Sequence, residues 1–339
     1  MLFRSYAPGT LPIRINANPY ASATNTLTIK PATGNVLIQG TSDSAIFVLN
    51  AADYVIIEGS ASPVTNTLCP LNLSVRNLTI QNNKNDGGQN YAVVKLQSNA
   101  TDGATNNIIR NCNIIGASAV AVGPVTFAGI AICAPGTISG TNLGTNNNNN
   151  TIENDSIMKC NNGIYSQGAS AFIKNQGNSY KYNRLNTSGT NAIGRCGVYI
   201  GFENNSTITG NYIGKFAPLG SGQDVTGILL GGTSNSTQFS TVGSNEVTNC
   251  TITKNVIDSL AGWPGTGTSG ASAIGIVGCS SPSGFVSSGT NIISNNVISQ
   301  IKAFARVTSS VSDFGCGIFL GTQLGATWKV YNKIGRAHV

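Results

Sequence analysis

A short motif recurs along the 339-residue chain, and this repetition limits the fold more than any other feature of the sequence. The motif reads N-x-I-x-N-x-x-I, and the starts of successive copies lie 28 to 46 residues apart. Repeats of about 20 to 50 residues are typical of solenoids, because each unit buries its apolar side only by stacking on its neighbours. An incomplete eighth copy runs from Trp328 to Asn332. The seven full copies are LSVRNLTI (73–80), NIIRNCNI (107–114), NTIENDSI (150–157), NSYKYNRL (178–185), STITGNYI (206–213), NEVTNCTI (245–252) and NIISNNVI (291–298).

A second motif lies between these copies and predicts a buried strand. It places glycine before a β-branched residue and a short apolar run, which suits a strand entered through a tight turn. Clear examples are AGIAIC (128–133), NGIYSQ (162–167) and CGVYIG (196–201). Towards the N-terminus, strands are expected about every nine residues, at TLTIK (26–30), NVLIQG (35–40), AIFVL (45–49) and YVIIEG (54–59). Three short strands per coil predict an all-β parallel solenoid.

The second asparagine of the N-x-I-x-N-x-x-I motif is expected where the chain bends between two strands, because Asn tolerates a left-handed backbone. The isoleucines on either side then point into the core. Stacked coils lie about 4.8 Å apart, so these asparagines are predicted to form a ladder of amide hydrogen bonds from coil to coil. Tyr182 and Gly210 interrupt the column. Its expected members are Asn77, Asn111, Asn154, Asn249, Asn295 and Asn332.

The two ends of the chain, MLFRS (1–5) and KIGRAHV (333–339), have a common explanation. A nucleotide stretch that encodes MLFRS has a reverse complement that encodes Lys-Ile-Gly-Arg-Ala-His, and this stretch resembles a sequencing-library adapter. We therefore expect one solenoid domain over 6–332, truncated at both ends and flanked by translated adapter. Without the ends the only histidine, His338, is lost and the net charge falls from +7 to +4. The lower charge argues against a nucleic-acid partner.

Together the two motifs resemble the right-handed parallel β-helix of the pectin-lyase-like superfamily, over Leu27 to Asn332. The region from NTLTIK (25–30) to VRNLTI (75–80) is similar to β-helix segments of large secreted bacterial surface proteins. The resemblance implies a single-stranded right-handed parallel β-helix with about three short strands per coil. It also implies an extracellular or cell-surface location.

Many proteins of this superfamily cleave acidic polysaccharides, so the resemblance raises two classes of enzyme. Hydrolases similar to polygalacturonases use grouped aspartates and a His-Gly pair, and residues 6–332 have no histidine and no cluster of aspartates. Lyases use an Arg or Lys base, with carboxylates that hold calcium or neutralise the uronate. Calcium is therefore expected only if the protein is a lyase, and no other cofactor is expected. The chain has no C-x-x-C motif, so no metal site is predicted.

The weak candidates for lyase residues are charged positions in successive copies. Aligning the copies places Arg76, Arg110, Glu153 and Lys181 at one outward position, with Asp155 and Arg184 close by. In a lyase this column would bind a uronate carboxylate, and Lys181 or Arg184 would act as the base. The two acids are few for calcium, which takes about six to eight oxygen ligands. The alternative interpretation is a solvated face of surface ion pairs.

A second column follows the G-I motif, one residue after the isoleucine. Its predicted members are Ala131, Tyr165, Tyr199, Leu229, Val277 and Phe319. If the column is exposed, Tyr165 and Tyr199 would stack on sugar rings and bind a glycan. If the long loops between the strands cover it, the column is a second apolar core.

These features favour a secreted or cell-surface β-helix protein with a non-catalytic adhesion, structural or polysaccharide-binding role. The expected partner is a polysaccharide or a cell-surface glycan. No segment approaches the roughly 20 apolar residues of a membrane span, so no membrane insertion is expected. The alternative is a polysaccharide lyase that acts on an acidic, uronate-containing glycan.

Overall fold

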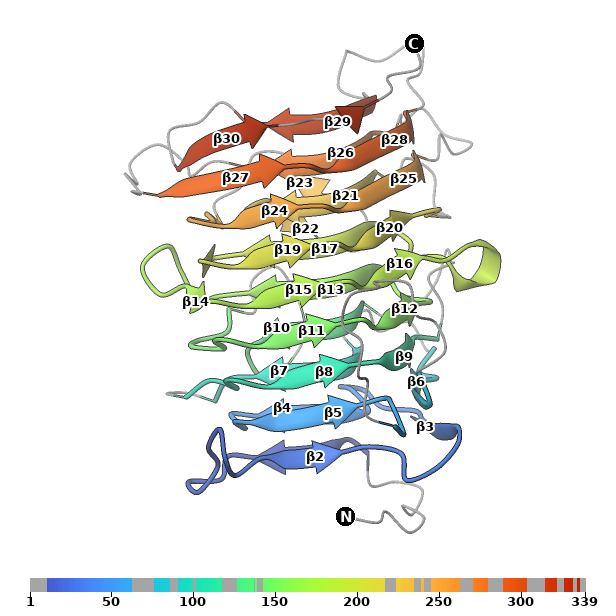
Figure 1. Cartoon of the computed structure of the whole chain (residues 1–339), viewed down its shortest axis with the longest axis vertical. Coiled ribbons are helices and arrows are strands. Elements are labelled where there is room, and N and C mark those ends of the chain that lie inside the picture. The colour runs from blue at the N-terminus through green and yellow to red at the C-terminus, as the bar shows by residue number, and fades with distance from the viewer. Residues whose placement is uncertain are drawn as a thin grey trace.

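The chain winds into nine coils stacked along one axis (Figure 1). The computed structural model describes residues 11–62, 76–85, 91–99, 102–117, 127–136, 138, 143–216, 224–234, 239–240, 245–262, 271–279, 289–303, 315–321, 326–331 and 334–335. Each coil contributes one strand to each of three nine-stranded sheets, and all pairings within these sheets are parallel. Residues 1–5 and most of 333–339, the expected adapter segments, lie outside the described part.

The strands of the three sheets follow one another in strict rotation along the chain. Sheet 1 contains β1 (Ile13–Asn16), β4 (Phe47–Asn50), β7 (Ala92–Gln97), β10 (Ala128–Cys133), β13 (Asn162–Gln167), β17 (Cys196–Gly201), β21 (Val225–Leu230), β26 (Ala273–Gly278) and β29 (Gly315–Leu320). Sheet 2 contains β2 (Leu27–Ile29), β5 (Val55–Glu58), β8 (Ile108–Arg110), β11 (Thr151–Glu153), β15 (Ser179–Lys181), β19 (Thr207–Thr209), β24 (Thr251–Thr253), β27 (Thr290–Ser294) and β30 (Thr327–Tyr331). Sheet 3 contains β3 (Val36–Gly40), β6 (Leu78–Asn82), β9 (Cys112–Ile115), β12 (Ser156–Met158), β16 (Arg184–Asn186), β20 (Tyr212–Gly214), β25 (Val256–Ala261), β28 (Val297–Lys302) and β31 (Ile334–Gly335).

A few short elements lie outside the three sheets. Two small pairs are β14 (Asn175–Gln176) with β18 (Glu203–Asn204) and β22 (Thr233–Ser234) with β23 (Phe239–Ser240). A 3-10 helix, η2, spans Gly189–Asn191. Within the described ranges, no helix has the length and apolar character needed to cross a membrane.

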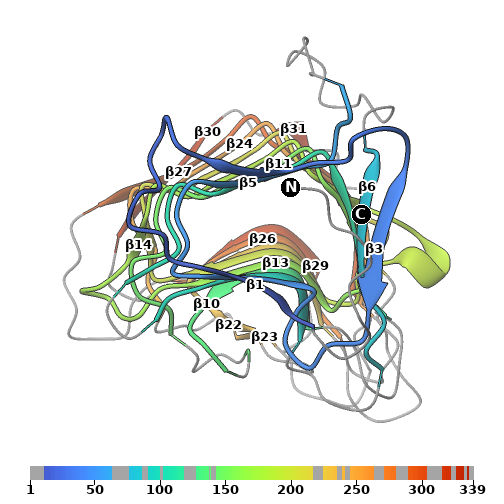
Figure 2. The ribbon, with the colours of Figure 1, turned by 90° about the horizontal axis from the view of Figure 1, so that it is seen from below.

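The three sheets enclose one elongated core, which is seen end-on from the N-terminal side in Figure 2. From this end the chain passes from sheet 1 to sheet 2 to sheet 3 clockwise as it recedes, so the coil is right-handed. The predicted right-handed parallel β-helix, with three strands per coil, is therefore confirmed.

The two motifs explain how each coil packs. The isoleucines of N-x-I-x-N-x-x-I, such as Ile208 in sheet 2 and Ile213 in sheet 3, are fully buried in the core. The glycine of the G-I motif allows the next coil to approach closely. A Cβ on Gly197 would lie 2.6 Å from the carbonyl oxygen of Gly227, a contact that no other residue tolerates.

Most of the predicted asparagine column adopts the expected backbone, with Asn77 as an exception, but the column does not carry the main ladder. Asn111, Asn154 and Asn295 have φ between +52° and +59°, as a left-handed bend requires. One amide bond joins this column, from Asn154 Nδ2 to Asn111 Oδ1 at 2.7 Å. Asn332 lies outside the described residues.

The continuous ladder lies one residue further along, at the start of sheet 3. Asn183, Asn211, Asn255 and Asn296 are at most 5% exposed. In each step the side-chain oxygen of one asparagine accepts the backbone N–H and the side-chain N–H of the asparagine one coil below, at 2.9 to 3.1 Å. A shorter ladder at the start of sheet 2 joins Asn107, Asn150 and Asn178 in the same way.

One copy of the repeat was predicted in the wrong register. Thr251–Thr253 pairs with Thr207–Thr209, so Ile252 rather than Val247 stands above Ile208. Asn249 therefore precedes the sheet 2 strand, and Lys254 occupies the left-handed bend with φ +58°. The sequence contains two overlapping motif-like segments here, and the pattern alone favours the wrong one.

Candidate functional site

The predicted charged column exists on the outer face of sheet 2, but one member differs. Pairing of the strands places Glu58, Arg110, Glu153 and Lys181 at one position in four successive coils. Acid and base alternate, with Arg110 Nε 2.5 Å from Glu58 Oε2 and Lys181 Nζ 3.5 Å from Glu153 Oε2. These contacts match the alternative interpretation of a self-neutralising row of ion pairs.

Arg76 is not a member of this column, which corrects the alignment of the copies. It lies just before β6 of sheet 3, because the chain between β5 and β6 is longer than in other coils. Its guanidinium reaches across to Asn154, donating from Nε to the carbonyl oxygen at 2.7 Å and from a terminal nitrogen to Oδ1 at 2.9 Å. Burial lowers the pKa of Arg76, and nearby Asp155 opposes that shift.

Asp155 is a fully buried member of the sheet 3 ladder. Its Oδ1 accepts the backbone N–H of Cys112 at 2.7 Å, and its own N–H donates to Asn183 Oδ1 at 3.0 Å. Burial raises its pKa to about 8, against the opposing effects of the Cys112 N–H and of Arg76. The carboxyl group is sealed from solvent, so it has no access to a polysaccharide or to a solvent-exposed calcium ion.

The weak candidates for a lyase base are on neighbouring strands but differ in their surroundings. Lys181 is ion-paired with Glu153, so its amino group already has an acidic partner. Arg184 begins β16 on the outer face of sheet 3 and is half-buried. Within the described ranges, no group of three or more His, Cys, Asp or Glu residues is placed to bind a metal ion.

The aromatic column has the predicted register but not the exposure that glycan binding requires. Ala131, Tyr165, Tyr199, Leu229, Val277 and Phe319 pair in that order across sheet 1. Tyr165 and Tyr199 stack with ring centroids 4.6 Å apart, and both rings are fully buried. The column belongs to a second apolar cluster on the outside of sheet 1, with Phe127 and Ile138 packed on it.

The buried tyrosines are held by polar contacts as well. Tyr199 donates its hydroxyl to the carbonyl oxygen of Gly232 at 2.9 Å and accepts a hydrogen bond from Asn245 Nδ2 at 2.8 Å. Tyr165 donates to Gln167 Oε1. The prediction that Tyr165 and Tyr199 present their faces to a glycan is therefore wrong, because both rings are buried among residues such as Phe127 and Asn245.

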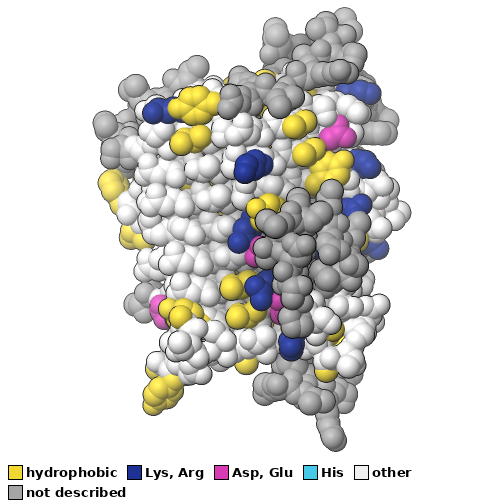
Figure 3. Space-filling view, in the orientation of Figure 1, with side chains coloured by type: hydrophobic (Ala, Val, Ile, Leu, Met, Phe, Trp, Pro, Cys, Tyr) yellow, Lys and Arg dark blue, Asp and Glu magenta, His cyan; other side chains and the backbone are white. Residues whose placement is uncertain are grey.

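A partly exposed basic surface is found instead around the corner between sheets 2 and 3. We call it the basic face, and it consists of Lys181, Tyr182, Arg184, Tyr212 and Lys254. Arg184 and Tyr212 are direct partners on adjacent strands, and Val256 follows them in the same column with 36% of its surface exposed. Figure 3 shows basic side chains spread over this side of the molecule, with few acidic ones.

Two tyrosines contribute flat surfaces to the basic face. Tyr182 occupies the left-handed bend of its coil, with φ +59°. In the next coil the same position is Gly210, and a Cβ there would lie 2.4 Å from Tyr182 Cδ1, so the ring lies directly over the glycine. Lys254 occupies this position one coil further on, which places a cation beside the aromatic surface.

The basic face has few acids to neutralise it. Asp258 is the only acidic residue in the nine strands of sheet 3. Its two carboxylate oxygens accept hydrogen bonds from the hydroxyls of Ser259, at 3.0 Å, and Ser299, at 2.7 Å. Neither Arg184 nor Lys254 makes an ion pair with a residue that the structure describes. This part of the surface therefore keeps a positive potential.

Sequence reasoning found Lys181 and Arg184 but missed Tyr182, Tyr212 and Lys254. In the sequence pattern Tyr182 only interrupts the asparagine column, and the incorrect register of the sixth copy assigns Lys254 to the wrong position. The signal that finds Tyr212 is its place in the motif STITGNYI, where it directly precedes the buried Ile213 and must point outward.

Comparison with known proteins finds similarity only to solved structures. No protein-family model matches the chain, and no curated protein matches it. Among solved structures, it is similar to the crystal structure of PfbA, a surface adhesin of Streptococcus pneumoniae, with 16% identity and a TM-score of 0.39. The match covers 91% of this chain and 60% of that chain, so this chain spans about three fifths of the adhesin's length.

Proposed function

We propose that this chain is a non-catalytic, extracellular or cell-surface protein that binds an acidic polysaccharide on the basic face. The observation that carries this proposal is the pair of cations at the corner of sheets 2 and 3, half-buried Arg184 and exposed Lys254. They lie next to two tyrosine rings and are opposed in sheet 3 by Asp258 alone. The catalytic candidates offer less support for a lyase, because Lys181 is ion-paired and Asp155 is sealed in the ladder.

The geometry of a β-helix suits a repeating ligand. Successive coils lie about 4.8 Å apart, so equivalent side chains present a regular row along the axis. An acidic polysaccharide also repeats its carboxylate and its sugar ring at regular intervals. Arg184 supplies a planar guanidinium suited to a carboxylate, and Tyr182 and Tyr212 supply rings suited to the apolar face of a sugar.

Single substitutions on the basic face are expected to weaken binding of polygalacturonate modestly. Arg184→Ala or Lys254→Ala should each lower the affinity about two- to fivefold, since an exposed ion pair contributes about 0.4 to 1 kcal/mol. The double variant should lose about tenfold, because the two residues lie in different coils and their effects should add. Biolayer interferometry with immobilised polygalacturonate measures these affinities.

The matched control is Lys30→Ala, which removes an exposed lysine at the end of β2, far from the basic face. It should leave the affinity unchanged. Equal affinities for the native protein and the Arg184→Ala, Lys254→Ala double variant would show that this surface is not the binding site. Ultraviolet-absorbing unsaturated product that disappears in a folded Lys181→Ala variant would instead establish the lyase alternative.

A further inference from the structure

A second exposed surface lies at the opposite corner, between sheets 1 and 2. The loop of residues 168–174 connects β13 to β14 there and carries Phe172 and Ile173 at its tip. The Phe172 side chain is 84% exposed and that of Ile173 is 49% exposed. This corner is on the left in Figures 1 and 2, near the label β14. Apolar side chains this exposed on an ordered loop are a feature of binding sites.

The tip has a defined shape that does not depend on burial of its apolar side chains. Ser170 Oγ accepts the backbone N–H of Phe172 at 3.3 Å and that of Ile173 at 3.1 Å. The N–H groups of Ala169 and Ser170 donate to the carbonyl oxygen of Ile173 at 3.0 and 3.1 Å. These bonds close a tight turn that holds Phe172 outward.

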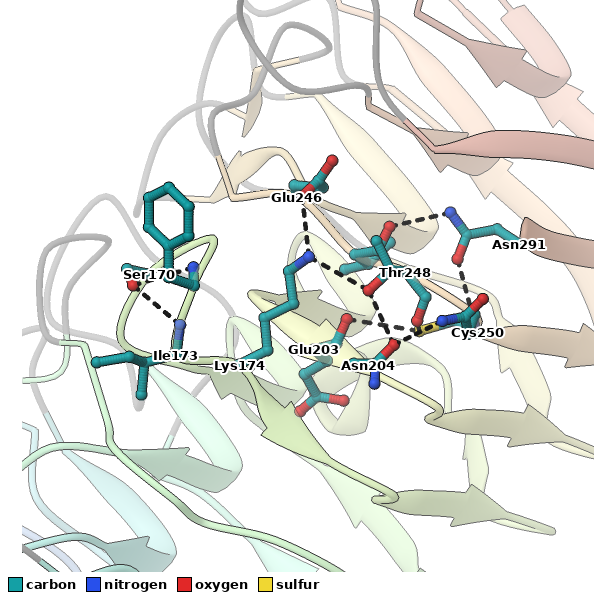
Figure 4. Close-up of polar contacts among 12 residues, drawn as sticks. Ser170, Ile173, Lys174, Glu203, Asn204, Glu246, Thr248, Cys250 and Asn291 are labelled. Atoms are coloured by element: carbon teal, nitrogen blue, oxygen red, sulfur yellow. Dashed lines mark hydrogen bonds and ion pairs between the residues drawn. The ribbon is translucent and has the colours of Figure 1, made fainter. Parts of the chain in front are cut away.

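The base of the loop is fixed by a nearly buried ion pair. Lys174 Nζ lies 2.9 Å from Glu246 Oε2 and donates to Thr248 Oγ1 at 3.2 Å (Figure 4). The side chains of Lys174 and Glu246 are only 9% and 2% exposed. Because Glu246 belongs to a coil further along the stack, the contact ties the loop across neighbouring coils and reduces the entropy lost on binding.

A row of amides runs along the axis beside the loop. The backbone N–H of Gln176 donates to Asn148 Oδ1 at 2.7 Å. Two bonds then join side-chain amides: Asn204 Nδ2 donates to Gln176 Oε1 at 2.7 Å, and Asn249 Nδ2 donates to Asn204 Oδ1 at 2.9 Å. Their spacing of one residue per coil is about 4.8 Å. Each amide carries both donors and acceptors, the combination that sugar hydroxyls require. Apart from the mutually neutralised Lys174 and Glu246, these residues carry no charge.

We propose that the Phe172 loop and this amide row form a binding site for an uncharged polysaccharide. The ring of Phe172 stacks on the apolar face of one sugar, and the amides hydrogen-bond to hydroxyls of the sugars that follow along the axis. The lack of net charge beside the loop favours a neutral glycan over an acidic one. The site is separate from the basic face and does not depend on the function proposed for that face.

Affinity electrophoresis in native gels tests this site. The probes are three uncharged polymers, hydroxyethyl cellulose, galactomannan and dextran, each compared with a gel without polymer. At least one polymer should retard the native protein. Phe172→Ala should raise the dissociation constant derived from the retardation about tenfold, as expected for loss of an aromatic stacking contact. Because Phe172 is exposed, the variant should fold normally, which circular dichroism can check.

Two comparisons make the result specific. Tyr20→Ala removes another highly exposed aromatic ring, 80% exposed near the N-terminal end, and should leave the retardation unchanged. Gln176→Ala should weaken it, because the amide row contributes hydrogen bonds. The proposal is overturned if none of the three polymers retards the native protein, or if Phe172→Ala is retarded as strongly as the native protein. Sedimentation with phosphatidylcholine vesicles tests a lipid partner, and the proposal also fails if Phe172→Ala weakens only vesicle binding.

Discussion

Replacing Asn183 by alanine is expected to destabilise the protein by roughly 3 to 5 kcal/mol, since each buried polar group left unsatisfied costs about 1 to 3 kcal/mol. Asn183 is 1% exposed and serves three groups at once. Its Oδ1 accepts the N–H of Asp155, and its Nδ2 donates to the carbonyl oxygen of Ile152 and to Asn211 Oδ1. Alanine leaves all three without that partner. Urea denaturation followed by circular dichroism measures the free energy of unfolding.

The matched control for the ladder is an exposed amide pair. Asn50 Nδ2 donates to Asn16 Oδ1 at 3.0 Å at the surface, where water can replace the bond. Asn16→Ala should therefore change the free energy of unfolding by less than about 0.5 kcal/mol. If the two substitutions cost the same, the buried ladder does not stabilise the fold as we infer.

Asp155→Asn is expected to stabilise the protein at neutral and alkaline pH. The position is occupied by asparagine in the four coils that follow, and each amide nitrogen donates to a backbone carbonyl in the coil below. Asp155 Oδ2 makes no hydrogen bond. An ionised carboxylate can only accept hydrogen bonds, so it cannot donate to the backbone carbonyl as the asparagines do. Asparagine supplies the missing donor and carries no charge to bury.

The pH dependence follows from the raised pKa of Asp155. Its pKa is about 8 in the folded state and 3.8 ordinarily, so between these values the folded state holds a proton that the unfolded state has lost. The free energy of unfolding therefore falls by about 1.4 kcal/mol per pH unit as the pH rises from about 4 to 8, and then levels. Asp155→Asn removes this contribution, so the variant gains most over the native protein at pH 8 and above.

The diagnostic quantity is the difference between the variant and the native protein across pH. Burial also raises the pKa of Glu203, which contributes a slope of the same sign to both proteins. Asp43→Asn, at an exposed carboxylate paired with Lys84, is the matched control. A constant difference between pH 4 and 8 for Asp155→Asn would mean that Asp155 is ionised in the folded protein.

Much of the fold follows from residues close together in the sequence. The period of the motif, the inward isoleucines and the left-handed Asn111 and Asn154 all reflect local backbone preference and side-chain alternation. Even the register of Tyr165 against Tyr199 follows from aligning the G-I motifs. The sequence pattern predicts the ladder one residue before its true position, because both positions are often asparagine. Only burial distinguishes the ladder position from that of Asn154.

The sites depend on features that have no repeat. Tyr165 packs against Phe127 and belongs to one apolar cluster with Ile138, two residues outside the repeated motifs. Arg76 lies outside the charged column because the connection between β5 and β6 is longer than in other coils. Glu58 occupies the column position that the sequence pattern assigns to Arg76. The anchoring of the Phe172 loop depends on Lys174 meeting Glu246, a contact 72 residues apart in sequence that no local pattern encodes.

The most direct test of the proposed function uses the Phe172→Ala variant, which lacks the second proposed site, and compares its binding to polygalacturonate and to the fully methyl-esterified form, at low and high salt. The ultraviolet absorbance of each mixture is recorded at the same time. We expect binding to the charged polymer that weakens as salt screens the basic face, little binding to the esterified polymer and no change in absorbance. Equal binding to both polymers, no binding to either, or a rise in absorbance from unsaturated product would contradict a non-catalytic protein that recognises acidic polysaccharide.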